Sequence, residues 1–308
     1  MSPRIGLVGC GRWGRLILRD LLKLGAEVTV TCLTEETAAF ARAQGARAAG
    51  RALPEPAELD AYVVATPAAT HAAVLEAIVA AGKPIFVEKP MTTDAASARR
   101  FAALAPDRLF VMDKWRHHPG IEAMRREVAS GALGRVSAIR ASRWQWSSPH
   151  RDVTPLWVLS PHDLAITLHI LGRLPPLAQA FAVVPGRPEL GFVAVLRDAE
   201  TQVIVEAGIV ETGHRRRCLV VGDLGVLELT DAYDDSVQVR RGPPGEAAAE
   251  AVTLPVSTEM PLEAELRVFL AHLRGEGPPP HSSARDSALV VERLAEIEAA
   301  LGLPPAVA

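Results

Sequence analysis

Hydrophobic residues in the first 120 positions come in short runs separated by stretches with helical spacing. The runs are rich in β-branched residues and predict strands at 5–9, 27–32, 61–65, 84–87 and 109–112. Between them, apolar residues recur every three or four positions and predict helices at 14–24, 35–44, 70–81 and 94–104. This alternation indicates βαβ units and a parallel sheet. Right-handed crossovers would bring the carboxyl ends of the strands to one edge.

The pattern changes after Pro119. A helix at 121–130, a long strand at 136–146 and a helix at 154–171 are predicted first. Turn residues then separate strands at 178–184, 191–196, 202–210, 217–222, 226–230 and 236–240. Strands joined by short turns indicate an antiparallel sheet. Two helices, at 262–273 and 285–301, close the chain.

These patterns predict an α/β protein with two domains. Residues 1–119 would form a doubly wound parallel sheet. Residues 120–308 would form an α+β domain with a large open, mainly antiparallel sheet. In an alternative arrangement, the last helices of the chain pack back on the first domain.

Composition removes several classes of protein. The net charge of −3 gives no basic field for nucleic acid or an acidic membrane surface. The three cysteines, with no CxxC pair, argue against disulfides and a cysteine zinc site and favour the cytoplasm. No apolar segment reaches the roughly 20 residues that a membrane helix needs.

The sequence Gly9-Cys10-Gly11-Arg12-Trp13-Gly14 lies between the first strand and the first helix. In that context a GxGxxG sequence predicts a dinucleotide site. Gly9 allows a tight turn, Gly11 lets a diphosphate approach the backbone, and Gly14 lets the helix pack close to the strand. The helix N–H groups would face the phosphates. An ordinary strand–turn–helix is the alternative.

The second predicted strand ends without the acid that usually binds the ribose of NAD. The chain reads Thr31-Cys32-Leu33-Thr34-Glu35, with no basic residue directly after the strand. The choice between NAD and NADP therefore stays open.

Two later strands also end on the edge where ligands bind in open α/β sheets. One is followed by Thr66-Pro67 and His71, the other by Glu88-Lys89-Pro90. Lys89 is the strongest catalytic candidate, because a partly desolvated lysine beside a cofactor can hydrogen-bond a substrate hydroxyl. The alternative is a solvated lysine at a strand end.

The order of these motifs resembles the glucose–fructose oxidoreductase / inositol dehydrogenase / MocA family. The likeness continues through Gly131-Ala132-Leu133-Gly134-Arg135-Val136, His162-Asp163 and Val221-Gly222-Asp223-Leu224-Gly225. It implies NAD(P)-linked oxidation or reduction of a sugar, sugar nucleotide, polyol or related small molecule. It also implies that residues 1–119 are an NAD(P)-binding Rossmann domain and that residues 120–308 serve substrate binding and oligomerisation. Lys89 would be catalytic, a cis bond would precede Pro90, and a homodimer or homotetramer would form through the second sheet. The predicted cofactor residues are Gly9, Gly11, Arg12, Trp13, Gly14, Thr66, Pro67, His71, Glu88 and Lys89.

One part of the family pattern is altered. The family has an aspartate, three residues of any type, then a histidine. His162 falls on the histidine, but Val158 stands at the aspartate position and offers no hydrogen bond. Asp163 is adjacent, yet its side chain would point about 100° away on a helix. His162 can still act as an acid or base near neutral pH; a structural histidine is the alternative.

Weaker substrate candidates come after the fifth strand, at the end of the long strand of the second domain, and in the helix that follows it. They are Trp115, Arg116, His117, Trp144 and Asp163. Trp144 and Trp146 would lie on one face of their strand, so a core or interface role for Trp144 is equally compatible with the sequence. Arg116, Arg143 and Arg151 suggest an anionic group on the substrate. No metal site is predicted, because the adjacent pair His117-His118 is poorly spaced for a shared metal.

The leading hypothesis is therefore an oxidoreductase in which Lys89 and His162 handle the proton of the reacting oxygen. A non-catalytic dinucleotide-binding sensor is the rival, favoured by Val158. A hydrolase or lyase that uses bound NAD transiently is a third.

Overall fold

The computed structural model describes residues 2–148, 153–247 and 250–305. Arg151, one of the three suggested anion-binding arginines, lies outside these residues. The chain divides into two compact units. The first contains residues up to Lys114 together with Met260–Ala288, and the second contains Trp115–Glu259 and Leu289–Val307. Each unit is described by itself.

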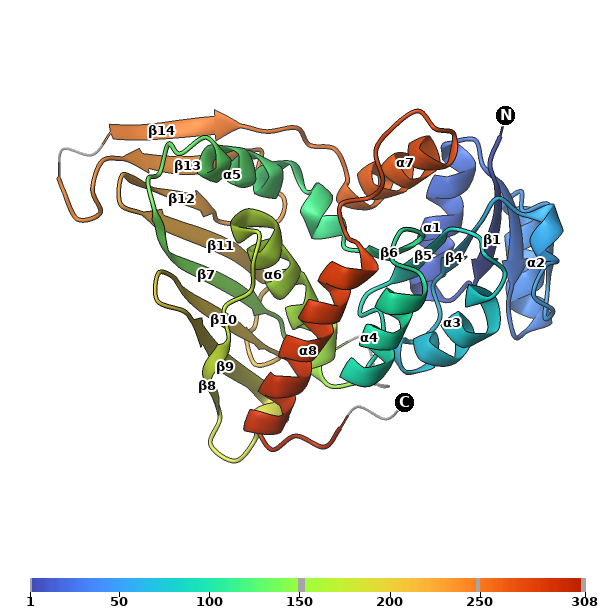
Figure 1. Cartoon of the computed structure of the whole chain (residues 1–308), viewed down its shortest axis with the longest axis horizontal. Helices are drawn as coiled ribbons and strands as arrows, with labels where there is room; N and C mark the ends of the chain where they lie inside the picture. The colour runs from blue at the N-terminus through green and yellow to red at the C-terminus, as the bar shows by residue number, and fades with distance from the viewer. Residues whose placement is uncertain (1, 149–152, 248–249, 306–308) are drawn as a thin grey trace. The chain divides into compact units, whose positions relative to one another are not determined.

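The first unit is built on a parallel six-stranded sheet in the order β3-β2-β1-β4-β5-β6 (Figure 1). Its strands are β1 (Arg4–Val8), β2 (Glu27–Thr31), β3 (Ala48–Gly50), β4 (Ala61–Val64), β5 (Ile85–Glu88) and β6 (Leu109–Met112). Its helices are α1 (Arg12–Lys23), α2 (Glu35–Ala43), α3 (His71–Val79), α4 (Ala95–Leu104) and α7 (Pro261–Leu273). The short helices η1 (Pro56–Glu58) and η2 (Ala68–Thr70) lie in its loops. The predicted parallel Rossmann sheet is confirmed.

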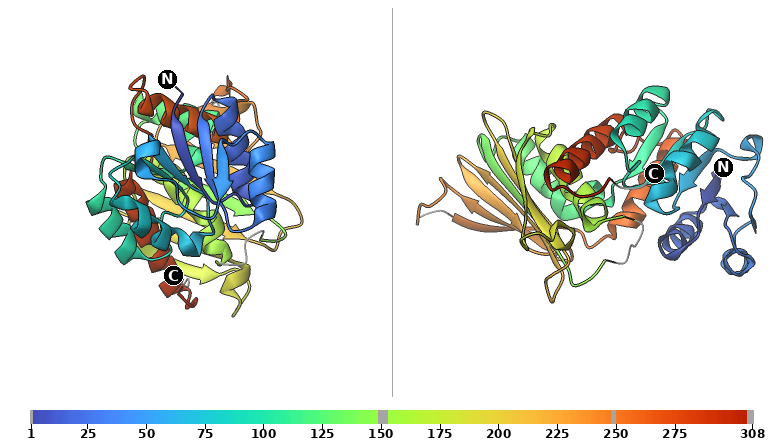
Figure 2. Two further views of the ribbon diagram at one scale, coloured as in Figure 1. Left: turned by 90° about the vertical axis from the view of Figure 1, so that its right-hand side faces the viewer. Right: turned by 90° about the horizontal axis from the view of Figure 1, so that it is seen from below.

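Helices lie on both sides of this sheet (Figure 2, left). Helices α1, α2 and α7 share one apolar core with the strands, in which Leu18, Val28, Phe86 and Phe269 are fully buried. Burial of such side chains stabilises the fold by roughly 1.5–3 kcal/mol each. Strand β3 was not predicted, because its three residues are Ala, Ala and Gly and carry no β-branched signal.

The second unit contains an eight-stranded sheet in the order β14-β13-β12-β11-β7-β10-β9-β8. Only the β7–β10 pair is parallel among its described strands. The strands are β7 (Val136–Trp144), β8 (Leu177–Ala182), β9 (Gly191–Arg197), β10 (Gln202–Gly208), β11 (Arg215–Gly222), β12 (Gly225–Leu229), β13 (Ser236–Arg241) and β14 (Glu250–Pro255). The predicted, mainly antiparallel sheet is confirmed, and β14 was missed because its segment follows a Pro/Gly/Ala loop.

Two helices, α5 (Pro119–Ala129) and α6 (Pro155–Leu171), pack on one face of this sheet (Figure 2, right). Helix α8 (Ala284–Ala300) begins in the residues of the first unit and ends in those of the second. In the second unit it is tied to α6 by Trp157, whose indole N–H donates to Glu298 Oε1 at 2.5 Å. The short helices η3 (Lys114–His117) and η4 (Pro188–Leu190) complete the structure.

The long strand of the second unit is shorter than predicted. Strand β7 ends at Trp144 rather than at residue 146. Trp144 is buried, whereas Trp146 is 68% exposed. The two tryptophans therefore do not share a strand face. Among the described residues, no helix is long and apolar enough to cross a membrane.

Candidate active site

The glycine-rich turn has the geometry that a bound diphosphate requires. Gly9 has φ +96°, and a Cβ there would lie 2.6 Å from Ala65 O. A Cβ on Gly14 would lie 2.4 Å from Gly9 O, so neither position accepts a side chain. A Cβ on Gly11 would instead meet nothing within 4 Å. Gly11 is also the N-cap of α1, and it has no side chain that could cap the first N–H groups of the helix. Open space beside the N-terminal N–H groups of a helix fits a dinucleotide diphosphate.

Trp13 connects this turn to the end of β5. Its indole N–H donates a hydrogen bond to Glu88 Oε1. The backbone N–H of Lys89 donates to the other carboxyl oxygen of Glu88 at 3.2 Å. Lys114 Nζ lies 4.4 Å from the centroid of the Trp13 ring, a cation–π distance. Glu88 is thus held between the cofactor turn and the predicted catalytic lysine.

Opposing effects act on the pKa of the Glu88 carboxyl group. Burial raises the pKa of this carboxyl, while Lys89, Lys114 and the Trp13 hydrogen bond act to lower it. The net pKa shift is upward, because desolvation is the largest effect.

His71 links the loops that follow β4 and β5. Its Nδ1 lies 2.8 Å from Pro90 O, and its Nε2 lies 3.0 Å from Thr66 O. Since carbonyl oxygens only accept, both bonds form together only when both ring nitrogens carry protons. The ring is 1% exposed. His71 therefore positions the predicted cofactor loops of Thr66 and Lys89, and the Lys89–Pro90 bond is cis, as the resemblance implies.

A second group of polar side chains gathers in the second unit. His162 lies on α6, and its ring centroid is 6.4 Å from that of Trp115. The Arg143 guanidinium carbon lies 4.4 Å from the Trp115 ring centroid. Arg143 also forms a buried two-pronged ion pair with Asp163, with Nη2 to Oδ1 at 2.9 Å and Nε to Oδ2 at 3.2 Å. Val158 lies one helical turn before His162 and is buried.

The weaker substrate candidates have different surroundings. Asp163 is bound by Arg143, so its carboxylate anchors α6 to β7. The Trp144 ring covers Gly191 and Gly208, where a Cβ would lie 2.8 and 2.4 Å from it, so this side chain belongs to the packing of the sheet. Arg116 is buried and His117 is partly buried. Cofactor binding stays a prediction for Arg12, Thr66 and Pro67.

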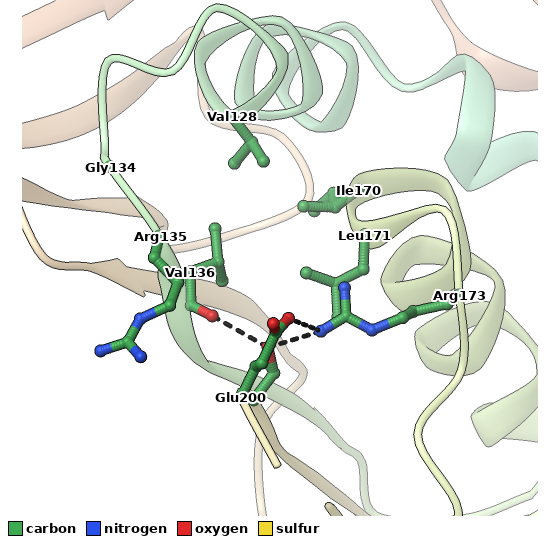
Figure 3. Close-up of a pocket in the computed structure, with 9 residues that line it drawn as sticks. Val128, Gly134, Arg135, Val136, Ile170, Leu171, Arg173 and Glu200 are labelled. Atoms are coloured by element: carbon green, nitrogen blue, oxygen red, sulfur yellow. Dashed lines mark hydrogen bonds and ion pairs between the residues drawn. The ribbon is translucent and has the colours of Figure 1, made fainter. Parts of the chain in front are cut away.

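A hollow elsewhere in the second unit does not contain the predicted residues. It is lined by Val128, Gly134, Arg135, Val136, Ile170, Leu171, Arg173, Glu200 and Thr201 (Figure 3). Arg173 points toward Glu200 there, at 3.3 Å, and also donates to Thr201. The described part of the chain has no cluster of three metal-binding side chains.

The buried Arg143–Asp163 pair gives a stability prediction. Asp163→Asn is expected to lower the free energy of unfolding by about 3 kcal/mol, because the Arg143 charge loses its counter-charge in a buried place. Thermal unfolding of the two proteins measures the loss. Glu228→Gln is the control, because the pair of Glu228 with Arg217 is partly exposed and is expected to contribute under about 1 kcal/mol. Equal losses in both variants would contradict the prediction.

The sequence is similar to that of known dehydrogenases. Residues 3–110 match the model of a family described as "Oxidoreductase family, NAD-binding Rossmann fold". Inositol 2-dehydrogenase 2 of Saccharopolyspora erythraea is 30% identical over 254 residues, which cover 74% of each chain.

Solved structures share the fold of the whole chain. UDP-N-acetylglucosamine 3-dehydrogenase from Acidithiobacillus ferrooxidans has a TM-score of 0.83 at 22% identity, over 98% of each chain. A levoglucosan dehydrogenase in complex with NADH has a TM-score of 0.82 at 17% identity, over 97% of each chain. At these identities the likeness concerns the fold.

Proposed function

Because the chain belongs to the glucose–fructose oxidoreductase / inositol dehydrogenase / MocA family of NAD-binding oxidoreductases, we propose that it is an NAD(P)-dependent dehydrogenase or reductase acting on a CH–OH carbon. The substrate class is a sugar, sugar nucleotide, polyol or related small molecule. The relatives named as dehydrogenases of inositol, a sugar nucleotide and levoglucosan support this class.

The observation that carries the proposal is the connection from the glycine-rich turn through Trp13 to Glu88 and Lys89. This connection fixes the predicted catalytic loop relative to the diphosphate site within one unit. The bound nicotinamide would supply the hydride chemistry, and the protein supplies position and charge.

Lys89 is proposed to hydrogen-bond the reacting substrate oxygen with its ammonium group. His162 is proposed to carry the proton of that oxygen to or from solvent. No carboxylate stands at position 158 to orient the ring, and Trp115 is the aromatic neighbour that packs beside it. Trp115 and Arg116 are proposed to contact the substrate, with an anionic substituent facing the arginines.

We also propose where the protein works, how it assembles and which cofactor it uses. The protein would work in the cytoplasm as a homodimer or homotetramer through the eight-stranded sheet. The cofactor is NAD or NADP, since Thr31 ends β2 and the exposed Leu33 follows where an acid or base would discriminate.

Turnover assays test the proposal and separate it from the sensor. Purified protein is mixed with NAD+ or NADP+ and with polyols, sugars and UDP-sugars, and with the reduced cofactors and keto-sugars. We expect a change in the absorbance of the reduced nicotinamide with at least one substrate. Cofactor binding by calorimetry, without turnover of any compound in either direction, would instead support the sensor, which Val158 favours. Product analysis identifies a hydrolase or lyase, because the cofactor then shows no net change.

A further inference from the structure

Glu265 is a buried carboxyl group that the proposed reaction does not use. It lies in α7 and is 1% exposed. Neither of its carboxyl oxygens has a hydrogen-bond partner among the described residues. An ionised carboxylate without partners in such a place costs several kcal/mol. A group of this kind in a native fold calls for an explanation.

Packing of α7 on the parallel sheet places Glu265 near the end of β5. The Phe269 ring centroid lies 4.7 Å from that of Phe86. Glu265 is one helical turn before Phe269, on the same side of α7. Glu88 is two residues after Phe86, on the same face of β5. Both glutamates therefore lie close to the phenylalanine contact, and Glu88 acts on the charge of Glu265, so we infer that they lie on the same side of it.

The charges around Glu265 come from the ends of β5 and β6. Burial has the largest effect on the pKa of Glu265 and raises it; Glu88 and Asp113 raise it further, and Lys114 lowers it, so that the pKa lies well above its usual value. Glu88 in turn faces Lys89 and Lys114. Two carboxyl groups that share a buried site do not readily ionise together. Because Trp13 donates to Glu88, the negative charge is better placed on Glu88 and the proton on Glu265.

This cluster lies at the nicotinamide half of the fold. In a Rossmann sheet each half binds one mononucleotide, and the diphosphate lies at the first glycine-rich turn. Strands β4, β5 and β6 form the half opposite to β2 and β3. The oxidised nicotinamide ring carries a positive charge and the reduced ring carries none. The two cofactor forms would therefore differ by one charge in the half of the sheet that contains Glu88.

We propose that Glu265 holds one proton beside an ionised Glu88 when the site is empty or holds reduced cofactor, and releases it to solvent when oxidised cofactor binds. The step transfers one proton to water and no electrons. The pair would then carry a second negative charge, in the half of the sheet that would bind the cationic ring. The inference rests on the proposed function in requiring that a pyridine nucleotide binds here, and it makes Glu265 a positioning residue that acts through Glu88.

The affinity for oxidised cofactor is expected to depend on pH in one direction. Binding that releases one proton becomes tighter as the pH rises, by up to about tenfold in Kd per pH unit. The Kd of the reduced cofactor lacks this dependence. The preference for oxidised over reduced cofactor therefore increases with pH.

Calorimetric titration tests the proposal without any substrate. NAD+, NADH, NADP+ and NADPH are titrated into the whole protein near neutral pH, in buffers of different ionisation enthalpy. We expect the heat to depend on the buffer, with release of up to one proton, for the oxidised form only. Glu265→Gln is expected to bind both forms without this difference, because the amide resembles the protonated acid in shape and does not titrate.

The control is Glu263→Gln, in the same helix. Glu263 is paired with Lys23 at 2.7 Å and is partly exposed, so its variant should release as much proton as the wild type. Infrared difference spectra of the wild type provide a second readout, in which the carboxylic acid band should weaken when NAD+ replaces NADH.

Heats of NAD+ binding that do not depend on the buffer in the wild type would overturn the proposal. Unchanged proton release in Glu265→Gln would overturn it as well. If that variant does not fold, an unchanged carboxylic acid band in the wild type would overturn it. Absence of binding by all four nucleotides would overturn it too. Proton release by a protein that turns over no substrate would refute the proposed dehydrogenase activity and leave this inference standing.

Discussion

Lys89→Met is expected to lower kcat by about a thousandfold, with a much smaller change in the Kd of the cofactor, which Lys89 is also predicted to contact. Methionine retains the length of the side chain and removes its ammonium group, which we propose to hydrogen-bond the reacting oxygen. Loss of a positioned acid or base typically costs about 10²–10⁴ in rate. Steady-state kinetics with the best substrate of the panel, and calorimetric titration of the cofactor, measure the two quantities.

Lys83→Met is the matched control for this prediction. Lys83 is also partly buried, but it precedes β5 and so lies at the opposite end of that strand. Its substitution is expected to leave kcat within about twofold of the wild type, in the range of surface changes. If Lys89→Met kept most of its activity, the proposed role of Lys89 would be wrong even though the family assignment would stand.

Gly11→Asp is expected to weaken cofactor binding by a hundredfold or more and to leave the unfolding midpoint almost unchanged. A Cβ at Gly11 has open space around it, so the folded chain accepts a side chain there. That space is where the diphosphate would approach, and the carboxylate would repel it at the N-terminus of α1. Losing one or two hydrogen bonds to a charged group, at roughly 1.5–3 kcal/mol each, corresponds to this factor.

Calorimetric titration and thermal unfolding of the same variant separate binding from stability. Gly213→Asp is the control, because a Cβ at Gly213 also meets nothing within 4 Å. It lies in the turn before β11, and its variant should bind cofactor like the wild type. A Gly11→Asp protein that still bound NAD(H) with normal affinity would show that the diphosphate does not approach this turn.

The sequence by itself determined the features that depend on neighbouring residues. The glycine-rich turn, the parallel and antiparallel sheets and the cis bond before Pro90 follow local patterns or a family motif. At Gly9 and Gly14 the close approach to Ala65 and to Gly9 leaves no room for a Cβ, so only glycine meets the requirement. Turn geometry and side-chain periodicity act over a few residues, which is why a sequence shows them. The cofactor and catalytic roles assigned to Lys89 and His162 stay predictions.

Contacts between distant segments were decided by the tertiary structure alone. Trp13 and Glu88 are 75 positions apart, yet share a hydrogen bond. Asp163, a weak substrate candidate in the sequence, is bound by Arg143, and no spacing rule connects these two residues.

Glu265 shows the same limit most clearly. Its spacing from Leu262 and Phe269 sets it on the apolar side of α7, and this was the one available signal. A glutamate in an amphipathic helix is ordinarily solvated, so periodicity alone does not reveal burial. Whether a carboxyl group is solvated depends on what packs over it, and here that is the sheet of β5 and β6, more than 150 residues earlier in the chain. Local patterns thus specify the elements and the turn, while the electrostatic environment of the site arises only when those elements pack together.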